Sequence, residues 1–179
     1  DANALASFLN KYPNGTLRQE ALGRMEELKW ARASSAGTPA ALREFLREFP
    51  SGRRSAEAEL ALRKLEAASS DSAAVLQAIQ KLAAAFQQRS PEAVKAIWTG
   101  LSEAQAVTIG NSLRDARAVK YELRPIGDPE ITNETAKVAC KRSLQFEFAQ
   151  GAAQPVQDEV SITLRKRGAN WVIENVQTR

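Results

Sequence analysis

The sequence predicts an α+β protein in two parts. Residues 1–70 are expected to form an all-α segment of helical hairpin repeats, and residues 71–179 an α+β domain of three helices packed on an antiparallel sheet. Apolar residues before position 70 have helical spacing and recur at a fixed offset. Three further helical patterns lie between residues 73 and 115, and after residue 116 apolar and polar residues alternate as in strands. Helices followed by antiparallel strands typically form two packed layers.

The first 70 residues contain an internal repeat with an offset of 37 positions. Apolar and turn residues coincide when the chain is shifted by this offset, which is the sequence sign of stacked structural units. The identities match Ala4, Leu5, Phe8, Leu9, Pro13, Gly15, Glu20, Ala21 and Leu28 with Ala41, Leu42, Phe45, Leu46, Pro50, Gly52, Glu57, Ala58 and Leu65.

Each copy has the pattern of two helices joined by a turn. An apolar stripe spaced i, i+3, i+4 and i+7 marks the first helix of the second copy: Leu42, Phe45, Leu46 and Phe49. Pro50 then ends this helix, and Gly52 permits a tight turn. We expect four helices over residues 3–68, with these side chains buried between them: Phe8, Leu9, Phe45 and Leu46.

The motif F-L-x-x-[YF]-P-x-G occupies residues 8–15 and 45–52. It resembles the tetratricopeptide-like helical hairpin, in the variant found in bacterial envelope-assembly lipoproteins and in helical linkers of multidomain bacterial proteins. The resemblance covers about residues 2–68, although the standard period is about 34 residues. It implies a protein–protein interaction role. Two copies are few for a free-standing stack because each repeat is stabilised by its neighbours, so we expect either further repeats before Asp1 in the parent chain or a cap supplied by the second domain.

Three helices are expected between residues 73 and 115. The first is long and amphipathic, ends near Arg89 and carries Val75, Ile79, Leu82 and Phe86. Ser90 and Pro91 begin a short second helix, and a capping-box pattern at Ser102 and Gln105 begins the third. The polar run at residues 69–72 is expected to separate these helices from the repeats.

Alternating residues predict four strands, over residues 119–123, 136–148, 156–164 and 171–176. We expect a loop at residues 150–155. A hairpin centred near residue 152 would place Phe148 opposite Val156 and Asp158 opposite Phe146. In that register Arg142 and Asp158 are not cross-strand partners.

The order of these elements resembles the nuclear transport factor 2-like superfamily of cone-shaped domains. The resemblance covers about residues 73–178 and rests on Phe86, Pro91, Val94, Trp98, Val138, Arg142, Leu164, Gly168, Trp171 and Ile173. It implies a curved antiparallel sheet and three helices around a conical pocket. The superfamily includes ketosteroid isomerase, scytalone dehydratase and SnoaL-type polyketide cyclases, whose enzymatic members typically place Asp, His or Tyr in the pocket.

Two charged residues interrupt the apolar faces of the expected strands, Arg142 and Asp158. A buried charge must be paired or must line a wet cavity. Two interpretations stay open: a structural salt bridge that holds Arg142, or a small pocket in which Arg142 anchors an anionic or polar ligand. Tyr121 is expected in the core rather than as a catalyst. The candidate ligand-binding residues are Arg142, Trp98, Phe86, Tyr121 and Asp158.

Composition excludes several kinds of site. The chain of 179 residues has no histidine and one cysteine, Cys140. It therefore lacks Ser-His-Asp and Cys-His catalytic devices, intrachain disulfides and multi-cysteine metal sites. We assign no catalytic residue, no metal site and no cofactor, and we expect no enzyme.

The formal net charge of +4 is small. One face of the sheet is expected to gather basic residues, diluted by Glu122, Glu147 and Glu159, without the aromatic residues that stack on nucleic acid. These basic residues are Lys120, Arg124, Lys137, Lys141 and Arg165. A solvated face is therefore favoured over a phosphate-binding one.

The chain has no apolar run near the roughly 20 residues of a membrane span and no secretory pattern at its start. It begins at Asp1 within an expected helix, so we expect a fragment whose targeting segments lie upstream. The compartment, bacterial cytoplasm or periplasm, stays open.

We favour a non-catalytic C-terminal scaffold or interaction region of a larger bacterial multidomain protein, with a cone-fold module that senses a small ligand or dimerises. The alternatives are a cone-fold enzyme of isomerase or cyclase type with an unrecognised carboxylate, and a peptide- or polyanion-binding adaptor. The expected partners are a protein, neighbouring domains of the same parent chain, or a second copy bound through the sheet. We expect neither nucleic-acid binding nor membrane insertion.

Overall fold

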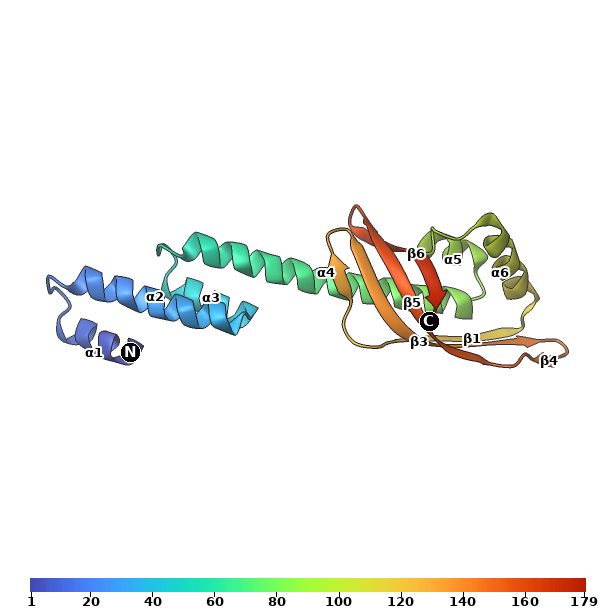
Figure 1. Ribbon diagram of the computed structural model, residues 1–179, viewed down its shortest axis with the longest axis horizontal. Coiled ribbons are helices and arrows are strands. Elements are labelled where there is room, and N and C mark those ends of the chain that lie inside the picture. Colours follow the sequence, from blue (N-terminus) through green and yellow to red (C-terminus); the bar gives the residue numbers. More distant parts are fainter. The chain divides into compact units, whose positions relative to one another are not determined.

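The computed structural model describes residues 1–179 and divides into two compact units, Asp1–Ser69 and Ser70–Arg179. The first unit is entirely helical, whereas the second combines helices with an antiparallel sheet (Figure 1). Helix α4 (Ser55–Gln87) begins in the first unit and ends in the second. No helix has both the length and the apolar character needed to cross a membrane.

The first unit contains α1 (Ala2–Lys11), α2 (Arg18–Ala36), α3 (Pro39–Glu48) and the beginning of α4. The offset of 37 positions is reproduced in the backbone, because shifting the bounds of α1 by it gives those of α3. Tyr12 and Phe49, which end these helices, have nearly the same dihedral angles, φ −128° and ψ 64° against φ −129° and ψ 66°. Each precedes a proline, which disfavours helical backbone at the residue before it. The four expected helices are present, and their tetratricopeptide-like character stays a prediction.

Local signals also set the boundary between the two copies. Helix α2 ends at Gly37, whose φ of 59° lies in the left-handed region that glycine adopts without strain. The Thr38 side chain then accepts a hydrogen bond from the Ala41 amide, and Pro39 occupies the first turn of α3.

The core of the first unit lies between α2, α3 and α4. Phe45 is 3% exposed, and its ring centroid lies 5.5 Å from that of Trp30. The prediction that Phe8, Leu9 and Leu46 would be as deeply buried is wrong, since all three are only partly buried. Helix α1 has no buried residue, and its main packing partner is α2.

The boundary between the two units falls between Ser69 and Ser70, within the run expected to separate them. The expectation that separate helices would flank this run is wrong, because α4 continues through it without interruption. This run holds serine and aspartate but neither glycine nor proline. Serine and aspartate lower helix propensity by only a fraction of a kcal/mol each, so a long helix tolerates them. Polar composition was therefore not a helix-ending signal.

The second unit adds two shorter helices, α5 (Pro91–Ile97) and α6 (Glu103–Asp115). Ser90 caps α5, and Ser102 with Gln105 forms the predicted capping box of α6, with both reciprocal hydrogen bonds present. The short gap between the two helices brings them against each other.

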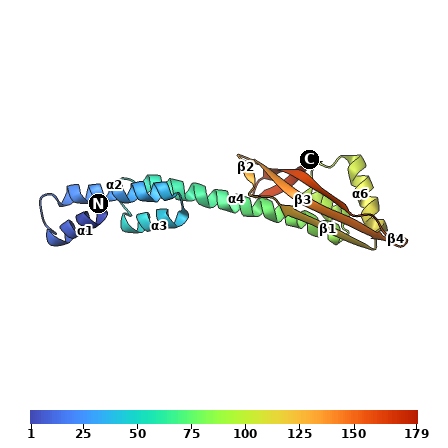
Figure 2. The same cartoon turned by 60° about the horizontal axis from the view of Figure 1, so that its bottom comes forward.

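The sheet consists of β1 (Ala118–Pro125), β2 (Glu130–Thr132), β3 (Thr135–Phe148), β4 (Gly151–Ala152), β5 (Val156–Arg167) and β6 (Asn170–Thr178). All named strands pair antiparallel in the order β1-β3-β5-β6, and β2 and β4 pair with β3. Figure 2 shows β1 beside β3 in this sheet.

One face of the sheet packs against the second half of α4. The predicted apolar stripe of this helix is buried, and it meets the inward residues of the strands in a single cluster. Fully buried members of this core include Val75, Ile79, Leu82, Val138, Cys140, Ile162, Leu164 and Ile173. This arrangement confirms the α+β class and places Phe86 and Tyr121 inside the unit.

The predicted register of the β3–β5 hairpin is wrong. The chain reverses directly after Phe148, which pairs with Gly151, instead of forming a loop over residues 150–155. Gly151 has φ of 126°, a backbone conformation open to glycine, which permits this tight reversal. The earlier turn shifts β5 along β3, so that Arg142 lies directly opposite Asp158.

Candidate functional site

Arg142 on β3 and Asp158 on β5 form a two-pronged ion pair. Arg142 Nε donates to Asp158 Oδ1 at 2.8 Å, and Nη2 donates to Oδ2. The two side chains are only 20% and 21% exposed. The hydrogen bonds from Arg142 to Asp158 raise the pKa of the Arg142 guanidinium further above its ordinary value. Both charges are therefore matched within the protein, as planar guanidinium and carboxylate groups permit.

Tyr121 lies beside this pair on the same face of the sheet, one strand away. Its ring stacks on Phe86 of α4 at a centroid distance of 4.4 Å, and the residue is 2% exposed. Burial raises the pKa of the Tyr121 hydroxyl to about 12, although the nearby Arg142 opposes this rise. Gln87 Nε2 donates to the Tyr121 carbonyl at 2.8 Å, which ties α4 to β1. Tyr121 is thus neutral at physiological pH and packed as a core residue.

Trp98 ends α5 and pairs with Ile173 of β6 through an isolated bridge. Its indole N–H is buried and has no hydrogen-bond partner. The following residues stay close to β6, because a Cβ on Gly100 would lie 1.7 Å from the Glu174 carbonyl oxygen. Trp98 is therefore the candidate residue with a fully buried polar atom that makes no hydrogen bond.

A hollow of about 430 Å³ touches Arg142 and Asp158 but opens on the opposite face of the sheet. Its other lining residues alternate with the inward ones: Glu122, Arg124, Lys141, Ser143, Gln157 and Glu159. Phe86, Trp98 and Tyr121 do not line it. The structure therefore joins Arg142 with Asp158, and Tyr121 with Phe86, without gathering all five candidates around one cavity.

The charges on that outer face are partly matched by neighbours. Arg124 pairs with Glu122 at 2.6 Å, and Arg165 pairs with Glu174 at 2.8 Å. Exposed pairs of this kind contribute little to stability, but they reduce the charge that is free to attract a polyanion.

A second polar cluster, which the sequence analysis did not predict, joins α4 to the sheet. Asp71 of α4 accepts hydrogen bonds from Lys166 Nζ at 2.9 Å and from Trp171 Nε1 at 3.1 Å. These bonds lower the pKa of the Asp71 carboxyl, the Lys166 bond having the largest effect. The available signal was spacing, because Asp71 precedes Val75 by four residues and so lies on the apolar stripe of its helix. This cluster fixes the β5–β6 hairpin to α4.

No group of three or more His, Cys, Asp or Glu side chains could hold a metal ion. Cys140 is buried without a disulfide partner, and burial raises the pKa of its thiol to about 11. A thiol in this state is a poor nucleophile.

No model of a known protein family matches the sequence, and neither does any curated protein. Solved structures do match, at low sequence identity. A protein of unknown function from Mycobacterium tuberculosis has TM-score 0.54 and 12% identity, over 64% of this chain and 74% of that one. A proposed dehydratase of the NTF2-like family from Streptomyces avermitilis has TM-score 0.50 and 12% identity, over 62% and 95% of the two chains.

A proposed aromatic ring hydroxylase from Novosphingobium aromaticivorans has TM-score 0.51 and 13% identity, over 61% of this chain and 93% of that chain. Similarities at this level show the fold. The second unit accordingly has an NTF2-like fold, a fold that hosts enzymes as well as binding modules.

Proposed function

We propose that this chain is a non-catalytic interaction scaffold, in which tetratricopeptide-like hairpins bind a protein partner and the NTF2-like unit serves as a structural or dimerising module. The observation that carries the proposal is the ion pair between Arg142 and Asp158. These charged residues interrupt the inward faces of β3 and β5 near Tyr121, and each neutralises the other.

A general acid or base must be free to exchange a proton with a substrate near the operating pH. Asp158 is occupied on both oxygens by Arg142, and Tyr121 has a pKa of about 12 and a ring stacked on Phe86. The chain has no histidine, and the other acid and base that meet on the inward face, Asp71 and Lys166, pair with each other. This arrangement favours a structural role of the second unit over a catalytic one.

Thermal unfolding with small ligands tests the proposal. The panel holds acetate, citrate, inorganic phosphate and a steroid enone, and we expect none of them to raise the melting temperature of the wild type. Asp158→Asn should lower the melting temperature and frees Arg142 to accept an anion from solution. Glu159→Gln, the neighbouring charge change on the outer face, is the matched control and should behave as the wild type. A ligand that stabilises the wild type and is turned over would overturn the proposal.

A second candidate, small-ligand sensing, is favoured by the unpartnered indole N–H of Trp98. A buried donor without an acceptor costs about 1–3 kcal/mol, and a polar ligand atom could supply the acceptor. Trp98→Phe removes this donor while keeping an aromatic ring. A ligand that stabilises the wild type but not Trp98→Phe, without turnover, would favour sensing over a purely structural role.

A further inference from the structure

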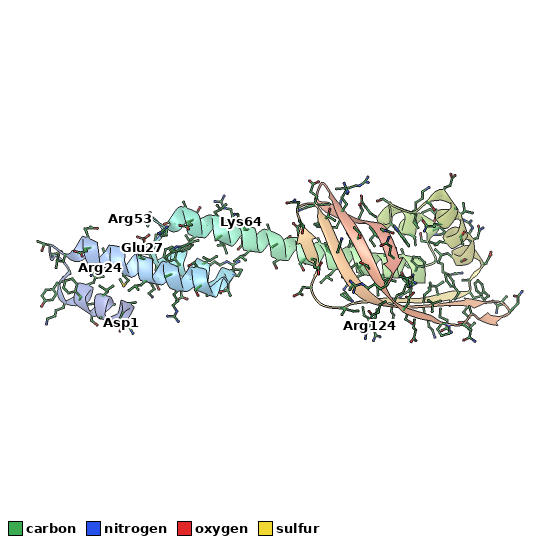
Figure 3. The ribbon with its side chains drawn as sticks, viewed as in Figure 1. Asp1, Arg24, Glu27, Arg53, Lys64 and Arg124 are labelled. Atoms are coloured by element: carbon green, nitrogen blue, oxygen red, sulfur yellow. The ribbon has the colours of Figure 1, made fainter.

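A groove of about 880 Å³ runs between α1 and α2 of the first unit. Its floor is apolar and is formed by Ala4, Leu5, Phe8 and Leu28. Charged residues form its rim, among them Asp1, Arg24, Glu27 and Arg53, which are labelled in Figure 3. Arg24 pairs with Glu20 at 2.7 Å, so part of this rim is already neutralised within α2.

The second copy of the repeat shows what fills such a groove. The counterparts of the four floor residues, 37 positions later, are Ala41, Leu42, Phe45 and Leu65. There, Trp30 and Ala33 of the preceding helix α2 pack on them in one apolar cluster. Leu42 and Phe45 are consequently 2% and 3% exposed, whereas Leu5 and Phe8 are only partly buried. Within residues 1–179, no helix covers the corresponding surface of the first copy in the way that α2 covers the second.

Two polar contacts accompany this packing in the second copy. Glu26 of α2 accepts a hydrogen bond from the Arg54 amide at 2.9 Å, just before α4 begins. Lys29 of α2 pairs with Glu48 of α3 at 3.1 Å.

The first copy keeps the backbone amide of the first contact but has the opposite charge at the second. The counterpart of the Arg54 amide is the Leu17 amide, at the start of a helix that has no side-chain cap. The counterpart of Glu48 is Lys11, so a covering helix needs an acidic residue where α2 has Lys29.

We infer that the groove between α1 and α2 binds an amphipathic helix of a protein partner with a defined pattern. The pattern is an acidic residue at i, a second acidic residue at i+3, an aromatic residue at i+4 and a small residue at i+7. The first acid accepts from the Leu17 amide and the second pairs with Lys11. The aromatic residue covers Phe8, and the small residue permits close approach to Ala4.

A second copy of this chain does not supply that helix, because the face of its α2 that carries Glu26 and Trp30 is already packed on α3 and α4. The stretch of α4 matched to those two residues has Arg63 and Ala67 instead. A basic residue cannot accept from the Leu17 amide, and alanine is too small to cover Phe8. This inference rests on the proposed interaction role and names the kind of partner that the role involves.

Two synthetic peptides test the inference against the full chain. One is the native α2 sequence, Arg18–Ala36, and the other is the same peptide with Lys29→Glu, which completes the acidic pattern. Both peptides have 19 residues and differ only at position 29, so their comparison isolates that charge change. By fluorescence anisotropy, the substituted peptide should bind about two- to tenfold more tightly, the range that one exposed ion pair in place of a repulsion provides.

Protein variants locate the binding. Lys11→Glu should reverse the preference between the two peptides, and Phe8→Ala should weaken both. Lys64→Glu makes the same charge change on the exposed surface of α4 (Figure 3) and should leave the preference unaltered.

The inference is overturned by any of three results. These are no binding of either peptide at millimolar concentration, a preference that survives Lys11→Glu, and self-association of the chain that Phe8→Ala abolishes. Such a failure would remove the groove as a site. The ligand panel on the second unit would still decide separately whether that unit is non-catalytic.

Discussion

The two copies of the repeat offer a matched pair of truncations, Phe45→Ala and Phe8→Ala. Phe45 is 3% exposed, and its ring lies 5.5 Å from Trp30 and 5.3 Å from Phe49 between centroids. Removing a ring buried to this extent should lower the free energy of unfolding of the first unit by about 3–5 kcal/mol. Phe8 has one aromatic neighbour, Tyr12 at 5.2 Å, and part of its surface is already in water. Its truncation should cost about 1–2 kcal/mol, since less apolar area returns to solvent.

Hydrogen exchange of the α2 and α3 amides during a urea titration reports on the first unit separately from the second. The expected outcome is a cost at Phe45 at least twice that at Phe8. Equal costs at the two positions would show that the face of α1 is as well covered as that of α3. That result would refute both the burial difference and the open groove.

Three further predictions concern the second unit. Asp71→Asn should destabilise this unit at pH 7. Because the pKa of the Asp71 carboxyl lies below its ordinary 3.8, the difference in unfolding free energy between variant and wild type should shrink as the pH falls below that value. Urea unfolding at pH 7 and pH 3 checks this. Gly100→Ala should lower the melting temperature, since the new Cβ would lie 1.7 Å from the Glu174 carbonyl oxygen, and an unchanged melting temperature would show that the loop moves freely. Cys140 should react with a thiol reagent only after denaturation, because it is buried with a pKa of about 11, and rapid labelling of the native protein would contradict this packing.

Elements whose ends are set by adjacent residues could be predicted from the sequence. Pro13 and Pro50 end α1 and α3 at matched positions, and the capping box at Ser102 and Gln105 begins α6. Apolar periodicity also identified the buried stripe of α4 and the inward faces of the long strands. These signals act within a few residues, so they do not depend on the rest of the fold.

Features that depend on competition between alternatives could not be predicted. The run at residues 69–72 weakens a helix slightly, but the packing of the flanking turns outweighs that cost and α4 continues. The β3–β5 register depends on a turn at Ala149 and Gln150, and nothing in the alternation distinguishes that turn from one a few residues later.

In the candidate site, too, the sequence identified individual residues but not the contacts between them. Charges within apolar strand faces identified Arg142 and Asp158 as residues that need partners. Whether they could partner each other was decided by the register, which the sequence left open. The contact of Asp71 with Lys166 and Trp171 joins residues about 100 positions apart, and only the spacing of Asp71 along its helix pointed toward it.

The coupling free energy between Arg142 and Asp158 tests the central claim most directly. A double-mutant cycle of Arg142→Met, Asp158→Leu and the double variant measures it. Trp30 of the first unit is replaced by Phe in every protein, so that Trp98 and Trp171 fluorescence in urea reports on the second unit. The structure predicts that each single change destabilises the second unit, because it leaves one mostly buried charge without its partner. The double variant should recover most of the loss, with a coupling of about 1–3 kcal/mol. A coupling near zero, together with stabilisation of the wild type by a small anion that Arg142→Met abolishes, would show that Arg142 serves a ligand and contradict the account.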